Sequence, residues 1–125
     1  MNLNELGNAK YIALETFRKN GEGVITPVWV VAENDKLYVW TPENSWKVKR
    51  IRNNKRIRVC KSDGRGKPQS DWLEAQARIL DSPEDEQKLR PYLVSKYGFL
   101  FRLANLLGPL MRQGKNRVVV EISSI

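Results

Sequence analysis

The sequence predicts an α+β fold that is mainly β: an antiparallel, barrel-like sheet with peripheral helices. The first observation is that the 125 residues contain about six runs rich in β-branched and aromatic residues. The second is that the links between most of these runs are of hairpin length, too short for the crossovers of a parallel sheet. The third is the length itself, which fits one domain over residues 1–125 with a core of its own.

The N-terminal half predicts a short helix followed by strands. Residues 3–8 have the composition of a short helix, and residues 10–18 alternate as a strand does. Residues 24–32 form a β-branched run, and a short Asn-Asp turn joins this run to a second one over residues 37–41. Two such runs around a short turn predict a hairpin.

Two helices are predicted from their start signals. Ser45 is placed to cap a helix over residues 45–54. Ser82, with Pro83 at the first helical position, starts another that runs to about Tyr97 and ends at Gly98. The remaining expected elements are strands over residues 55–62, 71–80 and 117–122, and an apolar helix or irregular segment over residues 99–111 that caps the barrel or fills an interface between subunits.

The composition excludes several kinds of chemistry. The chain has no histidine and one cysteine, Cys60, so Cys/His and Ser/His catalytic pairs, histidine-ligated metals and internal disulfides are excluded. Cys60 is expected to be buried in a strand. If the protein is an enzyme, a cofactor carries the reaction. The sequence shows no signal peptide and no apolar run long enough to span a bilayer, so we expect a cytoplasmic location.

Positive charge is concentrated in one stretch. The formal net charge is +8, and residues 47–67 hold ten Lys or Arg against a single acid, Asp63. Such a concentration indicates an anionic partner.

The start of this stretch has the elements of a phosphate site. Lys47 and Arg50 share one stripe of the predicted helix, and Thr41 and Ser45 place hydroxyl groups near its first turn. The N-terminus of a helix also offers free backbone N–H groups and a dipole that favours anions. The alternative interpretation is a solvated basic helix face.

A second candidate site is the segment Thr26-Pro27-Val28-Trp29. A proline within a β-branched run marks an edge strand or a bulge, where backbone groups are available to a flat polar ligand. The alternative is a packing feature of an edge strand. Trp29 and Trp40 could be core residues or walls of a site for a planar ligand.

These segments together resemble a known superfamily. The order and spacing of the matching segments, over about residues 9–98, are similar to those of the flavin-binding split β-barrel proteins related to pyridoxamine 5′-phosphate oxidase. The most similar branch is the one dependent on the deazaflavin coenzyme F420. The segments that carry the resemblance are Thr16-Phe17-Arg18, Thr26-Pro27-Val28-Trp29, Tyr38-Val39-Trp40-Thr41, Ser45 to Asn53 and Lys96-Tyr97-Gly98.

The resemblance implies an oxidoreductase that binds F420 or FMN and transfers a hydride to or from a small, for example quinone-like, substrate. It implies a homodimer with the cofactor at the subunit interface, and it names no catalytic side chain. The cofactor-binding residues that it implies are Thr26, Pro27, Val28, Trp29 and Trp40 around the ring, and Thr41, Ser45, Trp46, Lys47 and Arg50 around the phosphate.

The sequence also departs from the family pattern. Trp46 stands where the oxidases themselves carry an arginine, and the histidine of their substrate motif is absent, which argues against pyridoxamine 5′-phosphate oxidase activity. Further basic residues would suit the longer anionic tail of F420: Lys49, Arg52, Lys55, Arg56 and Arg58. Two alternatives stay open, a basic β-barrel that binds nucleic acid through stacked tryptophans and a flavin-binding protein without turnover.

Overall fold

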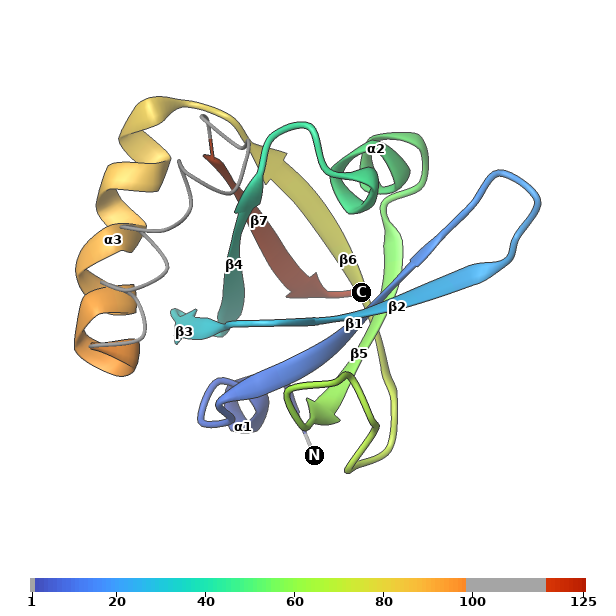
Figure 1. The fold of residues 1–125 in the computed structure, drawn as a ribbon, viewed down its shortest axis with the longest axis horizontal. Helices are drawn as coiled ribbons and strands as arrows, with labels where there is room; N and C mark the ends of the chain where they lie inside the picture. Colours follow the sequence, from blue (N-terminus) through green and yellow to red (C-terminus); the bar gives the residue numbers. More distant parts are fainter. Residues whose placement is uncertain (1, 99–116) are drawn as a thin grey trace.

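The computed structural model describes residues 2–98 and 117–125 (Figure 1). The strands are β1 (Tyr11–Phe17), β2 (Gly23–Val28), β3 (Val31–Glu33), β4 (Lys36–Pro42), β5 (Arg56–Ser62), β6 (Leu73–Leu80) and β7 (Arg117–Ser124), and the helices are α1 (Leu3–Leu6), α2 (Trp46–Asn53) and α3 (Pro83–Tyr97). The strands form one seven-stranded sheet in the order β2-β1-β5-β6-β7-β4-β3. Every pair of neighbouring strands is antiparallel.

The sheet curves into a split barrel. Its two edge strands, β2 and β3, follow each other in the chain, and only Trp29 and Val30 separate them. The chain therefore passes directly from one edge of the sheet to the other, although no ladder of hydrogen bonds between the described strands closes the barrel. This confirms the expected fold class, an antiparallel split β-barrel that is mainly β with peripheral helices.

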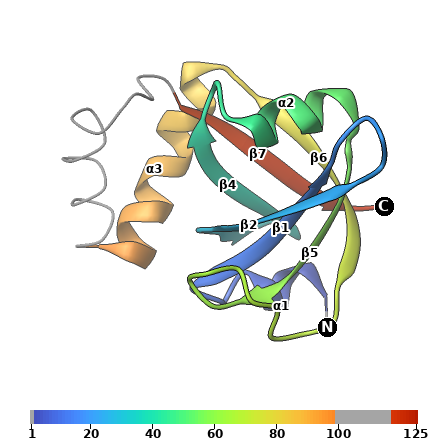
Figure 2. The ribbon, with the colours of Figure 1, turned by 45° about the vertical axis from the view of Figure 1, so that its right-hand side comes forward.

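The core fills the inside of the curved sheet. Alternate residues of the strands point inward and are almost fully buried, as expected for strands with one face in the core. The buried residues from six of the strands are Ile12, Leu14, Val28, Leu37, Val39, Ile57, Val59, Ala75, Ala77, Val120 and Ile122. Figure 2 shows α2 and α1 at opposite ends of the sheet, where Ile51, Leu3 and Leu6 add to this core.

Helix α3 covers part of the outer face. Leu89, Leu93 and Tyr97 pack with Val31 of β3 and Val119 of β7 in a second apolar cluster, which we call the outer cluster. Its partly buried members are Trp29, Tyr38, Trp40 and Leu80. None of the helices in the described part of the chain has the length and hydrophobicity needed to cross a bilayer.

The predicted strand over residues 24–32 is wrong in one respect, because the structure divides it. Residues 23–28 pair with β1, whereas residues 31–33 pair with β4. The hairpin prediction holds only for the second part, whose turn has positive φ angles at Asn34 (52°) and Asp35 (64°). The break occurs at Val30, where both backbone polar groups bond to side chains of α3 instead of a neighbouring strand.

The helix start signals are confirmed. Ser45 Oγ accepts a hydrogen bond from the N–H of Val48, and Ser82 Oγ accepts one from the N–H of Glu84. Helix α3 ends before Gly98, which has a φ of +49°. The expected segment over residues 99–111 lies outside the described residues.

Candidate anion-binding site

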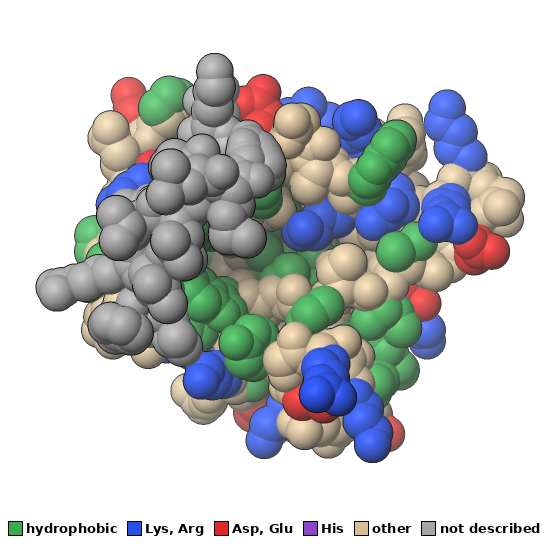
Figure 3. All heavy atoms as spheres, viewed as in Figure 1, with side chains coloured by type: hydrophobic (Ala, Val, Ile, Leu, Met, Phe, Trp, Pro, Cys, Tyr) green, Lys and Arg blue, Asp and Glu red, His purple; other side chains and the backbone are tan. Residues whose placement is uncertain are grey.

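An open pocket of ≈ 640 Å³ lies between the first turn of α2 and the edge strand β2. Figure 3 shows Lys and Arg side chains gathered over α2 and beside the hairpin of β1 and β2. The lining residues are Arg18, Val24, Thr26, Ser45, Trp46, Lys47 and Arg50. This set contains three cations and no acid among the described residues, and we call it the anion pocket.

One cation of the anion pocket, Lys47, has no acidic partner among the described residues. Across residues 2–98 and 117–125, the Lys47 side chain makes no hydrogen bond or ion pair. Burial, and then the nearby charge of Arg50, lowers the pKa of Lys47 below its ordinary value. A half-buried cation without a partner is costly, so an anion that entered this pocket would relieve that cost.

The two arginines of the anion pocket are held by neighbouring side chains. Arg50 Nε donates to Thr16 Oγ1 at 2.7 Å, which fixes the guanidinium against β1 near the turn of the β1–β2 hairpin. Burial, and then the charge of Arg18, lowers the pKa of Arg50. Arg18 itself pairs with Glu22 across the turn of the same hairpin. The two arginines thus line the anion pocket from the turn after β1 and from α2.

Neutral hydrogen-bond donors complete the anion pocket. Thr26 Oγ1 is buried and has no hydrogen-bond partner among the described atoms. The first intrahelical bond of α2 runs from the N–H of Lys49 to Ser45 O, so the N–H groups of Trp46 and Lys47 have no intrahelical acceptor. An unpartnered hydroxyl and a helix N-terminus beside three cations fit the needs of a phosphate group.

The structure brings together five of the residues expected from the sequence, Thr26, Ser45, Trp46, Lys47 and Arg50. Thr41 does not line the anion pocket. It is 1% exposed on β4, and its hydroxyl also lacks a partner among the described atoms.

The remaining expected residues lie apart from the anion pocket. Val28 is buried in the core, and Pro27 is exposed on the edge strand. Trp29 stacks on Tyr97 with ring centroids 4.5 Å apart. Trp40 Nε1 donates to Glu86 Oε1 at 3.2 Å, and the Arg117 guanidinium lies 4.8 Å from the centre of its ring. Both tryptophans are thus partly buried members of the outer cluster.

Sequence reasoning missed two lining residues, Arg18 and Val24. Val24 lies two residues before Thr26, on the same face of β2, so strand alternation could have identified it. Arg18 follows β1 and its N–H donates to Glu22 O at 2.8 Å, which places it beside the start of β2. Pairing of the two strands of this hairpin could therefore have identified Arg18 as a neighbour of β2.

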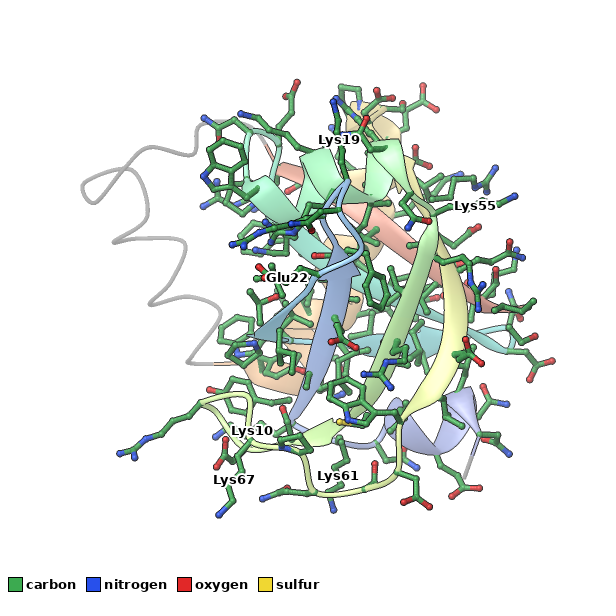
Figure 4. All side chains as sticks on the ribbon, turned by 90° about the vertical axis from the view of Figure 1, so that its right-hand side faces the viewer. Lys10, Lys19, Glu22, Lys55, Lys61 and Lys67 are labelled. Atoms are coloured by element: carbon green, nitrogen blue, oxygen red, sulfur yellow. The ribbon has the colours of Figure 1, made fainter. Side chains whose placement is uncertain are left out.

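The other basic residues do not extend the anion pocket into one surface. Figure 4 shows Lys19 and Lys55 at one end of the sheet and Lys10, Lys61 and Lys67 at the other. Arg56 and Arg58 each pair with a glutamate at 2.6 Å, and Arg52 lies 3.7 Å from Asp81. These arginines therefore have acidic partners in the structure, although Arg52 and Arg56 stay largely exposed, and their contact with a long anionic tail stays a prediction.

Cys60 is a structural residue in this fold. It is fully buried, and burial raises the pKa of its thiol, which disfavours the reactive thiolate. Within the described ranges, no group of three His, Cys, Asp or Glu could hold a metal ion.

Comparisons with known proteins find structural relatives but no sequence family. No protein-family model matches the sequence, and no curated protein matches it. The solved structure of an F420 reductase is similar with a TM-score of 0.62 and 18% identity, covering 98% of this chain and 92% of that one. A pyridoxamine 5′-phosphate oxidase-related, FMN-binding protein from Nostoc punctiforme is similar with a TM-score of 0.60 and 16% identity. The match covers 97% of this chain and 73% of that one.

A longer protein is similar as well. Atu2129 from Agrobacterium tumefaciens, of unknown function, gives a TM-score of 0.70 at 15% identity over 97% of this chain. This chain spans about half of it, 51% of its length. At these levels of identity the likeness establishes the fold, and the chain has the split β-barrel fold found in pyridoxamine 5′-phosphate oxidase-related, FMN-binding proteins and in an F420 reductase.

Proposed function

We propose that this protein binds a flavin-type cofactor, FMN or F420, with a phosphate of the cofactor in the anion pocket. The single observation that carries the proposal is the Lys47 ammonium, which is half-buried without a partner in the described part of the chain, in a pocket that also holds Arg18 and Arg50. The Thr26 hydroxyl, which has no hydrogen-bond partner among the described atoms, supports the same proposal, since it is a second group that a bound phosphate would satisfy.

Each residue of the anion pocket has a role in this proposal. Lys47 and Arg50 would neutralise the phosphate, and charge-assisted hydrogen bonds of this kind are the strong ones. Arg18 would supply a third cation from the hairpin. Thr26 would donate its hydroxyl, while Ser45 keeps the first turn of α2 in place so that the backbone N–H groups point toward the anion.

The ring of the cofactor would lie along the edge strand that leads away from the anion pocket. β2 is an edge strand, so alternate backbone groups of Thr26, Pro27 and Val28 point away from β1 and are available to a planar heterocycle. Trp29 and Trp40 would border the ring from the outer cluster.

A bound flavin or deazaflavin would supply hydride transfer, which the side chains themselves do not provide. The residues of this chain would bind the cofactor, orient its ring and limit the access of water, so that a small substrate is held over the ring. We therefore propose an oxidoreductase, with a quinone-like acceptor as the first substrate to test. If the protein binds the cofactor but reduces no acceptor, it is a flavin-binding protein without enzymatic activity.

We also propose a homodimer with the cofactor site near its interface. Large apolar side chains are exposed at the anion pocket and on its edge strand, with Trp46 70% exposed and Ile25 43% exposed. Sedimentation of the purified protein with and without FMN measures this directly, and a monomer under both conditions would contradict it.

The test of the proposed function is a pair of titrations of the purified protein, one with FMN and one with F420. Trp46 lines the anion pocket, so quenching of tryptophan fluorescence should report binding. We expect saturable binding of at least one of the two. Binding of F420 alone would identify a deazaflavin protein, binding of FMN alone a flavin protein, and binding of neither would contradict the proposal.

A further inference from the structure

Two residues at the end of α3 hold the connection between the edges of the sheet. Val30 lies between β2 and β3, and its N–H donates to the Tyr97 hydroxyl at 2.8 Å. Its carbonyl accepts from Lys96 Nζ at 2.5 Å. The single connection between the two edge strands is therefore fixed by side chains that lie far away in the sequence.

The same two residues tie this connection to the N-terminal segment. Lys96 Nζ also donates to Gly7 O at 2.7 Å, and Tyr97 Oη lies 2.8 Å from Lys10 O, which can accept its hydroxyl hydrogen. Tyr97 is 6% exposed, and burial raises its pKa to about 12, so the hydroxyl keeps its hydrogen. Three chain segments thus meet at one pair of side chains.

The orientation of Trp29 depends on this pair as well. The rings of Trp29 and Tyr97 stack with an interplanar angle of 11°, an arrangement that is favourable beyond the burial of area. One face of the Trp29 ring is therefore covered by Tyr97. Neither Lys96 nor Tyr97 lines the anion pocket, so any effect that they have on a ligand is exerted at the other end of β2.

We infer that Lys96 and Tyr97 are positioning residues for the ring of the cofactor. By fixing Val30 and stacking on Trp29, they set the path of the chain at the end of β2, against which the ring would lie. The inference rests on the proposed function, and it separates the proposed site into two parts. The anion pocket binds the phosphate, and the Lys96–Tyr97 pair shapes the part that receives the ring.

The test compares ligands with and without the phosphate. Riboflavin carries the ring alone, and FMN adds the phosphate; F420 and its tail-less deazaflavin fragment form the equivalent pair, and whichever pair binds the wild type is used. The variants are Lys96→Met, which removes two donated hydrogen bonds, and Tyr97→Phe, which keeps the ring stack and removes the hydroxyl. Lys88→Met, an exposed position on the same helix, is the matched control.

We expect Lys96→Met and Tyr97→Phe to lower the affinity for the ligand without a phosphate by about threefold to tenfold. The ligand with the phosphate should lose affinity by the same factor, so that the ratio between the two ligands is unchanged. The visible circular dichroism of the ring at saturation should also change, which a loss of stability alone would not cause. Lys88→Met should behave as the wild type.

Unchanged binding in the variants would contradict the positioning role. If either variant is folded and binds both ligands with wild-type affinity and an unchanged ring spectrum, the positioning role is wrong while the proposed function stands. Because Lys96→Met could prevent folding, Tyr97→Phe, which changes one hydroxyl, decides the question in that case. If the wild type binds neither FMN nor F420, the proposed function is wrong and this inference falls with it.

Discussion

Lys47 and Arg58 belong to the same basic stretch of the sequence, yet they lie in opposite electrostatic surroundings. Arg58 of β5 pairs with Glu15 at 2.6 Å, and the Glu15 side chain is 10% exposed and lies against Gly23. Lys47 of α2 has no partner among the described residues. A charge count cannot distinguish the two positions, but the surroundings can: Arg58 neutralises a nearly buried carboxylate and so belongs to the fold, whereas half-buried Lys47, with no described acid beside it, indicates a ligand.

The largest effect that we expect is on cofactor affinity. Lys47→Met should lower the affinity for FMN or F420 by about 10- to 100-fold, because a charge-assisted hydrogen bond contributes about 1.5–3 kcal/mol. Lys55→Met removes the same charge from the same stretch outside the anion pocket and should change affinity by less than about twofold. Fluorescence titration of the three proteins measures both. Equal losses in the two variants would mean that only overall charge matters.

The paired cation should affect stability instead. Arg58→Gln leaves the nearly buried carboxylate of Glu15 without its partner, which should cost about 1–3 kcal/mol of the free energy of unfolding. Affinity for the cofactor should not change. Urea denaturation provides the measurement, and a variant as stable as the wild type would show that this pair contributes nothing to the fold.

In urea denaturation, Lys47→Met should not lower the free energy of unfolding as Arg58→Gln does. Without ligand, removal of an unpaired half-buried cation should leave the protein as stable as the wild type or more stable, by up to about 1 kcal/mol. A saturating cofactor should then stabilise the wild type far more than the variant. Marked destabilisation of the ligand-free variant would place Lys47 among the residues that hold the fold.

The smallest expected effect is on pH dependence. Burial and Arg50 lower the pKa of Lys47 from its ordinary value of 10.5. The anion binds the protonated form, so affinity should begin to fall with rising pH before an ordinary lysine titrates. Lys47→Arg keeps its charge throughout and should lack this fall. Ionisation of the ligand is common to both proteins, so parallel pH profiles would exclude Lys47 as the cause.

Much of this arrangement was predictable because its signals are local. The N-caps Ser45 and Ser82 and the strand patterns lie within a few residues of the elements that they specify. The division of residues 24–32 was not predictable, because it depends on Lys96 and Tyr97, far away in the chain. Trp40 is another such case, since the helix that covers it lies beyond two further strands.

The anion pocket was predictable in part for the same reason. Ser45, Lys47 and Arg50 lie on one short helix, and helical spacing brings them together. Arg18 joins them only through the hairpin and the packing of α2 on β1, which a pattern along one segment does not contain. Whether a cation is paired is likewise a tertiary property, as Arg58 and its partner Glu15 demonstrate.

The most direct test of the phosphate role is the ratio of FMN to riboflavin affinity, or of F420 to its tail-less deazaflavin fragment if only the deazaflavins bind, in the wild type and in Lys47→Met. The ratio isolates the phosphate, because the ring is common to the two ligands of each pair. We expect a large ratio in the wild type that falls by about 10- to 100-fold in the variant, while affinity for the tail-less ligand is unchanged. A ratio that is the same in both proteins would contradict the assignment of the anion pocket to the cofactor phosphate.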